Sequence, residues 1–173
     1  MTLCDSITFE TSGPDETRTL GSSFARILTP GDFIALDGGL AAGKTCFVQG
    51  LAAGLDYHGS VTSPTFCLMH MYEGGRLPLC HFDLYRLESP DDLEGLGFDE
   101  YFYGDGVCVV EWGSLAADYL PDRRIGLVLE RPDTNAVADA DSYAVAEKRR
   151  IRATIYGGDD AWRKKWIAQL GAL

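Results

Sequence analysis

The sequence predicts an α/β fold over residues 1–173, a three-layer sandwich around a mixed parallel and antiparallel central sheet. Continuous apolar runs at residues 33–36 and 107–110 are typical of parallel strands that are covered on both faces. A hairpin signal predicts the antiparallel part, because Gly74-Gly75 separates two strand-like stretches, residues 67–72 and 79–85. We therefore expect antiparallel pairs beside parallel strands in one domain.

The other elements follow from local signals in chain order. A short strand is predicted at residues 7–10, and the acidic stretch after Gly13-Pro14 begins an amphipathic helix that ends at Pro30-Gly31. A helix start is predicted at residues 89–92, where a Ser-Pro pair precedes two acids. In the C-terminal third, two half-exposed antiparallel strands are expected at residues 125–130 and 150–156. An acidic loop is expected between them at residues 132–146, and a closing helix at residues 159–170.

The strongest signal follows the first apolar run. Residues 38–45 read Gly-Gly-Leu-Ala-Ala-Gly-Lys-Thr, which matches the phosphate-binding pattern G-x-x-x-x-G-K-[ST], and a helix is predicted directly after it. Glycines let the backbone turn sharply near a phosphate, and a helix N-terminus aims free N–H groups at the anion. The fold is therefore expected to be like that of P-loop nucleotide hydrolases. The expected nucleotide contacts are Gly38, Gly39, Leu40, Ala41, Ala42, Gly43, Lys44, Thr45 and Cys46.

Within this loop, the Lys44 ammonium is expected to reach the β- and γ-phosphates of a nucleotide, and the Thr45 hydroxyl to bind Mg²⁺. Such a site also needs a carboxylate near the metal and a group that orients the attacking water. Two acids end predicted strands, Asp83 after residues 79–82 and Glu111 after residues 107–110. Because strand carboxyl ends border the ligand crevice of open α/β sheets, both acids are candidates.

Thr65 is a further candidate. Pro64 holds the preceding residue in an extended conformation, which leaves the Thr65 hydroxyl on a short connection near the nucleotide. It is expected to sense the γ-phosphate or its metal as a switch threonine does. The alternative is that Thr65 is an ordinary β-branched strand residue. The three histidines share no metal-ligand spacing, and we interpret them as structural or surface residues.

Composition limits the partners. The formal net charge is −11 and the isoelectric point is near 4.6, which argues against a surface built to hold nucleic acid directly. The five cysteines include no C-x-x-C pair, which favours free thiols in a reducing compartment. No apolar run approaches the length of a membrane span, and the first twenty residues lack the apolar core of a signal peptide. We expect a cytoplasmic protein without a membrane partner.

Four strings together are specific to a family: G-x-L-x-A-G-K-T, S-P-T-F, H-F-D-L-Y-R-L and V-E-W. The chain resembles the bacterial TsaE (YjeE) family, from about Thr17 to Trp112. The resemblance implies an ATPase of tRNA threonylcarbamoyladenosine biosynthesis that uses ATP and Mg²⁺, acts with the TsaB and TsaD proteins, and meets tRNA only through that complex. It also implies that Glu111 is a metal-site residue together with Thr45, that Asp83 is catalytic together with Lys44, and that Thr65 is the switch threonine.

The loop departs from the family pattern at two positions. Where the family usually reads G-D-L-G-A-G-K-T, this chain has Gly39 in place of the acid and Ala41 in place of the third glycine. An alanine is tolerated at position 41 if the backbone there keeps a negative φ. A left-handed turn would cost on the order of 1 kcal/mol, because the Cβ crowds the following carbonyl.

Two functions of other classes remain open at this point. A small-molecule kinase would transfer the γ-phosphate to a hydroxyl, although no arginine-bearing lid segment stands out in the sequence. A non-catalytic, nucleotide-gated interaction module would instead use its acidic surface and aromatic side chains for docking. A GTPase is disfavoured, because the chain's one asparagine, Asn135, is not followed by the guanine-reading Asn-Lys-x-Asp pattern.

Overall fold

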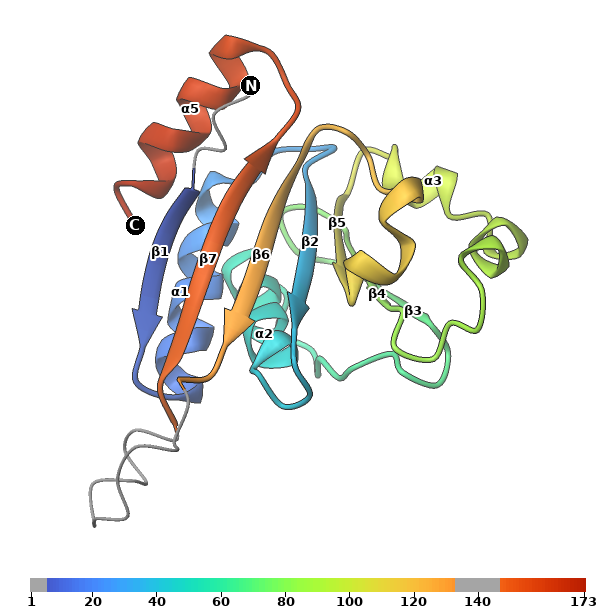
Figure 1. The fold of residues 1–173 in the computed structure, drawn as a ribbon, viewed down its shortest axis with the longest axis horizontal. Helices are drawn as coiled ribbons and strands as arrows, with labels where there is room; N and C mark the ends of the chain where they lie inside the picture. The colour runs from blue at the N-terminus through green and yellow to red at the C-terminus, as the bar shows by residue number, and fades with distance from the viewer. Residues whose placement is uncertain (1–5, 133–146) are drawn as a thin grey trace.

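The computed structural model describes residues 6–132 and 147–173. Within that part, a seven-stranded sheet has the order β1-β7-β6-β2-β5-β4-β3 (Figure 1). The strands are β1 (Ser6–Thr11), β2 (Phe33–Gly38), β3 (Met69–Tyr72), β4 (Leu79–Asp83), β5 (Val107–Glu111), β6 (Arg124–Glu130) and β7 (Arg149–Tyr156). The helices are α1 (Pro14–Ile27), α2 (Lys44–Gly54), α3 (Asp99–Phe102) and α5 (Asp160–Leu170), with 3₁₀ segments η1 (Pro90–Leu96) and η2 (Gly113–Tyr119).

The sheet is mixed, as the sequence predicts. Strands β4, β5, β2 and β6 pair in parallel, while β3, β7 and β1 pair with their neighbours in antiparallel fashion. The predicted Gly74-Gly75 hairpin joins β3 to β4, with Tyr72 opposite Leu79. The pairing of β6 corrects one expectation, because this strand is antiparallel to β7 but parallel to β2. Its alternating pattern arises because only one of its faces is buried, and burial pattern does not fix strand direction.

Two hydrophobic clusters lie on opposite faces of the sheet. The larger one fills the space between the sheet, α1, α2 and α5, and it includes Phe24, Phe47 and Trp166. The smaller one lies on the other face under η1, α3 and η2, and it includes Phe33, Phe82 and Phe102. This second layer covers only the part of the sheet around β2, β5 and β4 (Figure 1). The sandwich therefore has three layers over one half of the sheet and two over the other.

Helices α1 and α2 pack closely behind the sheet because small residues line their contact. A Cβ at Gly50 would lie 1.9 Å from the backbone oxygen of Arg18, and one at Gly21 would lie 2.3 Å from that of Phe47. Glycine at these positions lets the two helix backbones touch. The start of α2 is thereby fixed against α1, and α2 carries the predicted phosphate loop at its N-terminus.

The segment after β4 contains a helix start that was predicted from the sequence, but only short helical pieces follow it. The start predicted at residues 89–92 produces only the 3₁₀ segment η1, followed by the single-turn helix α3. Segment η2 has no counterpart among the expected elements, since its short turns lack a helical period. The predicted closing helix is present as α5. Most of the acidic loop expected at residues 132–146 lies outside the described residues. Within the described residues, no helix is long and apolar enough to cross a membrane.

Candidate functional site: a pocket at the strand ends

The predicted phosphate loop connects β2 to α2 and is shaped by two glycines with positive φ. Gly38 has φ 142°, and a Cβ there would lie 2.4 Å from the backbone oxygen of Leu129 in β6. Gly43 has φ 107° and precedes the first residue of α2. The first helical bond runs from the Phe47 amide to the Gly43 carbonyl at 3.0 Å. The amides before Phe47 therefore have no carbonyl within the helix and can receive an anion.

The two departures from the family pattern have different structural consequences. Ala41 has φ 57°, so its backbone takes the left-handed turn that disfavours a Cβ, at a cost on the order of 1 kcal/mol. Gly39 has no such requirement, because an added Cβ would meet nothing within 4 Å. The loop therefore keeps its shape in spite of Ala41, and position 39 has room for a side chain.

Lys44 is held inside the loop. Its Nζ donates to the carbonyl oxygens of Gly38 at 2.8 Å and Gly39 at 3.0 Å, and lies 3.9 Å from the ring centre of Trp112. Only 5% of Lys44 is exposed. Burial lowers the pKa of the ammonium, although the nearby Glu111 and Asp83 carboxylates oppose that shift. The loop carbonyls thus fix the position of the ammonium.

Trp112 directly follows β5, and its backbone is itself in the left-handed region, with φ 60°. A bulky residue is rare in this conformation. With this backbone, the Trp112 ring lies over the Lys44 ammonium. The Trp112 amide donates to the Leu36 carbonyl at 2.9 Å, and the ring packs against Tyr85 at 5.0 Å between centroids. From sequence alone, Trp112 had no role beyond packing.

Glu111 lies at the carboxyl end of β5 and accepts two hydrogen bonds on one oxygen. The Thr45 hydroxyl donates to Oε1 at 3.1 Å, and Nε2 of His81 is 2.9 Å from the same oxygen. His81 is fully buried in β4, and its Nδ1 atom has no hydrogen-bond partner in the structure. Nε2 must carry the proton in this contact, since Glu111 as a carboxylate can only accept. His81 is thus not a surface residue, and it fixes the orientation of Glu111.

Asp83, at the carboxyl end of β4, is paired in register with Glu111. Its Oδ2 atom accepts from the hydroxyls of Ser63 and of Thr65, the latter at 2.7 Å, and its Oδ1 atom accepts from the Tyr85 amide at 3.0 Å. Burial would raise the pKa of Asp83, but these three hydrogen bonds outweigh it and the pKa is lowered. Asp83 is therefore an ionised carboxylate that ties the Ser63–Thr65 segment to β4.

These side chains line one pocket of about 480 Å³, which is within the usual range for ligand sites. Its walls include Leu40 to Cys46 of the loop, together with the predicted Thr65, Asp83 and Glu111. Gly38 and Gly39 take part through the carbonyls that hold Lys44. The remaining wall comes from residues that were not selected as site residues from the sequence, namely Pro14, Thr17, Ser63, Tyr85, Trp112, Arg131 and Arg149.

The oxygen donors in this pocket fit a hard cation. A hydroxyl from Thr45 and a carboxylate from Glu111 are ligand types that Mg²⁺ prefers, and Mg²⁺ commonly completes its shell with substrate phosphates and water. Among the described residues, no group of three or more His, Cys, Asp or Glu side chains is placed to hold a metal by itself. The pocket therefore suits a metal that arrives with a phosphate ligand.

Comparison with known proteins places the whole arrangement in one family. The family model described as "Threonylcarbamoyl adenosine biosynthesis protein TsaE" matches residues 11–139. The tRNA threonylcarbamoyladenosine biosynthesis protein TsaE of Bacillus subtilis is 46% identical over 123 residues, which are 71% of this chain and 77% of that protein. The protein of the same name from Treponema pallidum is 47% identical over 114 residues, 66% of this chain and 84% of its own.

Similarity extends to a solved structure. The crystal structure of YdiB from Bacillus subtilis superposes with a TM-score of 0.75 at 32% sequence identity, and the match covers 99% of each chain. The α/β architecture with its mixed sheet is therefore shared along the whole length.

Proposed function

The chain belongs to the TsaE family of tRNA threonylcarbamoyladenosine biosynthesis, and from this premise we propose that it is the Mg²⁺-dependent ATP-binding and ATP-hydrolysing component of that machinery. In this proposal it acts with the TsaB and TsaD proteins on the modification at position 37 of tRNA. One observation carries the proposal: a phosphate loop and two strand-end carboxylates, Asp83 and Glu111, line the same pocket.

The pocket residues divide into binding and hydrolysis roles. The amides that precede Phe47 and the Lys44 ammonium would hold the phosphates, because both present positive charge at the helix start. Thr45 and Glu111 would hold Mg²⁺, which neutralises charge on the phosphates when bound. His81 keeps Glu111 aimed at the metal position.

Asp83 is proposed to orient the attacking water and accept its proton, since it is an ionised carboxylate on the pocket wall. The Thr65 hydroxyl is bonded to Asp83 in this structure. To contact a γ-phosphate or its metal, Thr65 would have to exchange that bond, which releases one lone pair of Asp83 for water. This exchange would make Thr65 a switch that links nucleotide binding to the catalytic carboxylate.

Exposed apolar side chains near the pocket support a partner-dependent activity. Leu40 on the loop is 76% exposed, Phe66 after the switch threonine is 86% exposed, and Tyr85 after Asp83 is 49% exposed. Leu40 and Tyr85 line the pocket and Phe66 follows the lining residue Thr65, and exposed apolar groups of this kind are typical of a surface that another protein covers. Hydrolysis by the chain alone is therefore expected to be slow and to rise when TsaB and TsaD are present.

The test is phosphate release from ATP and Mg²⁺, measured for the wild-type chain and Lys44→Ala, alone and with TsaB and TsaD. Calorimetry of ATP binding should show loss of tight binding in Lys44→Ala, while Asp83→Ala retains binding and hydrolyses slowly. Lys165→Ala, on the exposed side of α5, is the matched control for loss of one lysine. Equal phosphate release by wild type and Lys44→Ala would contradict the proposal.

A further inference from the structure

Among residues 6–132 and 147–173, no helix covers one face of the half-sheet β6-β7-β1. We call it the open sheet face and define it by the side chains that point away from α1 and α2, together with Lys148 just before β7. The outward residues of β6 and β7 pair as Arg124 with Tyr156, Gly126 with Thr154, Val128 with Arg152 and Glu130 with Arg150. On β1, the outward partners of β7 are Ser6, Thr8 and Glu10.

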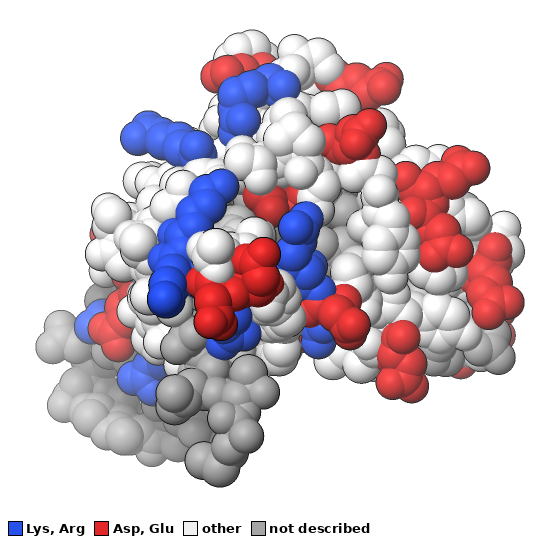
Figure 2. All heavy atoms as spheres, turned by 90° about the horizontal axis from the view of Figure 1, so that it is seen from above, with Lys and Arg blue, Asp and Glu red and all other residues white. Residues whose placement is uncertain are grey.

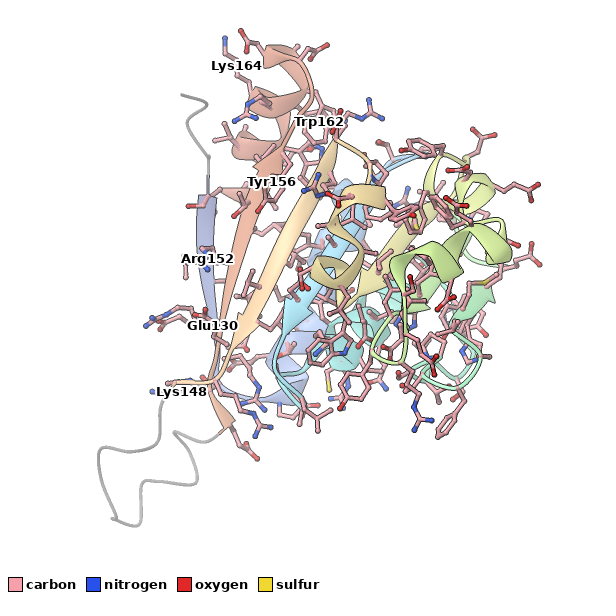
Figure 3. The ribbon with its side chains drawn as sticks, turned by 45° about the vertical axis from the view of Figure 1, so that its right-hand side comes forward. Glu130, Lys148, Arg152, Tyr156, Trp162 and Lys164 are labelled. Atoms are coloured by element: carbon pink, nitrogen blue, oxygen red, sulfur yellow. The ribbon has the colours of Figure 1, made fainter. Side chains whose placement is uncertain are left out.

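Figure 3 shows that this face forms a continuous strip. The labelled side chains run along β6 and β7 from Lys148 and Glu130 at one end, past Arg152, to Tyr156 and the nearby Trp162 at the other. Arg150 and Arg152 alternate with buried neighbours, so their side chains leave the same face about 6.7 Å apart. Strand β7 thus presents cations as a row.

The arginines in this row form loose ion pairs within the described part of the chain. Arg150 lies 3.6 Å from Glu10, and Arg152 lies 3.9 Å from Glu130, with half or more of each side chain exposed. Exposed ion pairs of this length stabilise a fold very little. The guanidinium groups can therefore turn toward another molecule at small cost.

The end of the strip near α5 is aromatic. The guanidinium of Arg124 lies 4.3 Å from the ring centre of Tyr156, and 38% of Tyr156 is exposed. A Cβ at Gly126 would lie 2.6 Å from the Tyr156 ring, so glycine lets the ring lie flat on the sheet. The strip thus combines an aromatic end with arginines along its middle, and tyrosine and arginine are both enriched in protein interfaces.

The strip also differs in charge from the rest of the chain. The strip contains two carboxylates, Glu10 and Glu130, and four cations, Lys148, Arg150, Arg152 and Arg124. It therefore has an excess of two positive charges, whereas the whole chain has a net charge of −11. Figure 2 shows acids without basic side chains along the right-hand side, which in Figure 1 holds η1 and α3, whereas basic and acidic side chains lie together to the left and in the middle.

We propose that the open sheet face is a docking surface for a partner protein whose contact surface carries an excess of acidic groups. The interleaved Glu10 and Glu130 favour a protein over a nucleic acid, because a continuous phosphate backbone would meet both carboxylates. A second copy of this chain, docked face to face, would bring two surfaces of excess positive charge together. An acidic protein surface can place single basic groups opposite the two carboxylates and acids opposite the arginines.

The size of the strip indicates a reversible contact. Three strands about 4.8 Å apart and seven residues long cover roughly 330 Å². That is less than half of the about 800 Å² per partner in a stable interface. A larger footprint would have to include the start of α5, where Trp162 lies beyond Tyr156 (Figure 3).

The strip meets the nucleotide pocket at its other end. Arg131 and Arg149, which follow and precede the outward residues Glu130 and Arg150, line the pocket. A partner on the strip would therefore reach the edge of the pocket to which our proposed function assigns ATP. The identity of the partner used in the test rests on that proposed function. The docking surface and the pocket remain separate sets of residues.

The experiment uses the purified TsaB–TsaD complex of the same organism as probe and measures its affinity for the full chain. Arg150→Glu with Arg152→Glu is expected to weaken binding about tenfold or more at about 0.15 M salt, because acids then meet acids. Arg150→Gln with Arg152→Gln should give a smaller loss in the same direction, and avoids repulsion with Glu10 and Glu130. ATP affinity should be unchanged in all variants.

The matched control is Arg26→Glu with Lys165→Glu, which makes the same charge change at exposed positions outside the strip and should alter partner affinity less than twofold. Partner affinity that is equal in the two reversal variants would overturn the inference, as would a wild-type chain that fails to bind the complex. The inference would also be overturned if the chain bound tRNA directly, or formed a dimer by itself, and the strip variants abolished that binding or that dimer. Failure of the proposed function would appear separately, as unchanged ATP hydrolysis in Lys44→Ala.

Discussion

The two halves of the sheet are built by different rules. Around β2, β5 and β4, both faces are covered, and every residue of β4 and β5 is buried. Around β6, β7 and β1, one face is open, and buried residues alternate with exposed ones along β7. The covered half carries Asp83, Glu111 and His81, whereas the open half carries the arginine row.

The difference explains where polar chemistry can be placed. In a strand buried on both faces, a charged side chain is tolerated only where hydrogen bonds satisfy it, and Asp83 and Glu111 accept such bonds at the strand ends. Those bonds also hold the carboxylates in fixed positions. On the open face, charges remain solvated, so they are free to meet a partner but contribute little to the fold. This difference fits our two proposals, which assign catalysis to the covered half and recognition to the open half.

The largest expected contrast concerns packing. Phe82→Ala should lower the free energy of unfolding by about 3–5 kcal/mol, because the buried ring packs between Phe102 and Tyr101 and leaves a cavity. Tyr156→Ala on the open face should cost about 1 kcal/mol or less. Urea denaturation of both variants measures the contrast. Similar losses for the two would show that the halves do not differ in this way.

A second prediction concerns His81, which orients the Glu111 carboxylate in the covered half. His81→Ala should weaken Mg²⁺-dependent ATP binding about 10–100-fold, since outer partners orient metal-binding carboxylates. His81→Gln keeps a donor that can reach Glu111 and should recover part of the loss. A Mg²⁺ titration at fixed ATP concentration separates the two variants. A merely structural His81 would instead give equal Mg²⁺ dependence in the alanine and glutamine forms.

The ionised state of Asp83 predicts a pH effect. Because folding lowers the pKa of this carboxyl, its contribution to stability is present above the unfolded value of about 4 and is lost as the pH falls through the folded value. The wild-type chain should therefore lose stability below about pH 4 more steeply than Asp83→Asn, which cannot titrate. Thermal unfolding followed between pH 6 and pH 3 tests this, and parallel curves would speak against it.

A smaller effect is expected at Ala41. Ala41→Gly removes the strain of the left-handed turn but adds freedom to the unfolded chain, so the net gain in stability should not exceed about 1 kcal/mol. Gly39→Ala at the neighbouring position, where an added Cβ meets open space, is the control. The denaturant midpoints of both variants, compared with that of the wild-type chain, measure the change in stability. A clear loss of stability in Ala41→Gly would contradict the prediction.

The smallest effect belongs to the open face. Arg152→Gln breaks the loose contact with Glu130 and should change the free energy of unfolding by less than about 0.5 kcal/mol. Thermal denaturation provides the measurement. A loss well above 1 kcal/mol would give Arg152 a structural role and remove the reason to assign it to recognition.

The sequence was sufficient to predict elements that depend on local patterns. Buried runs, the hairpin glycines and the phosphate-loop string predicted β2, β5, the β3–β4 turn and the start of α2 at their observed places. Asp83 and Glu111 could be selected because strand ends in an open sheet meet at one edge. The direction of β6 could not be predicted, since its alternation reports one-sided burial and is the same for either neighbour.

Residues that act through distant contacts could not be selected from the sequence. His81 meets Glu111 across 30 positions, and Ser63 meets Asp83 across 20, so no local spacing indicates either pair. Arg149 reaches the pocket because β7 lies beside β6, a pairing that sequence did not place next to the phosphate loop. The left-handed turns at Ala41 and Trp112 also depend on surrounding structure, because neither residue type favours them.

The close approach of Gly38 to Leu129 has a mechanical consequence. These residues are opposite each other in the β2–β6 ladder, and no side chain separates their backbones. Leu129 lies between Val128 and Glu130, two outward members of the open sheet face. Protein interiors are too densely packed to absorb a displacement without passing it on. A displacement of Leu129 toward β2 would therefore require Gly38, the first residue of the phosphate loop, to move with it.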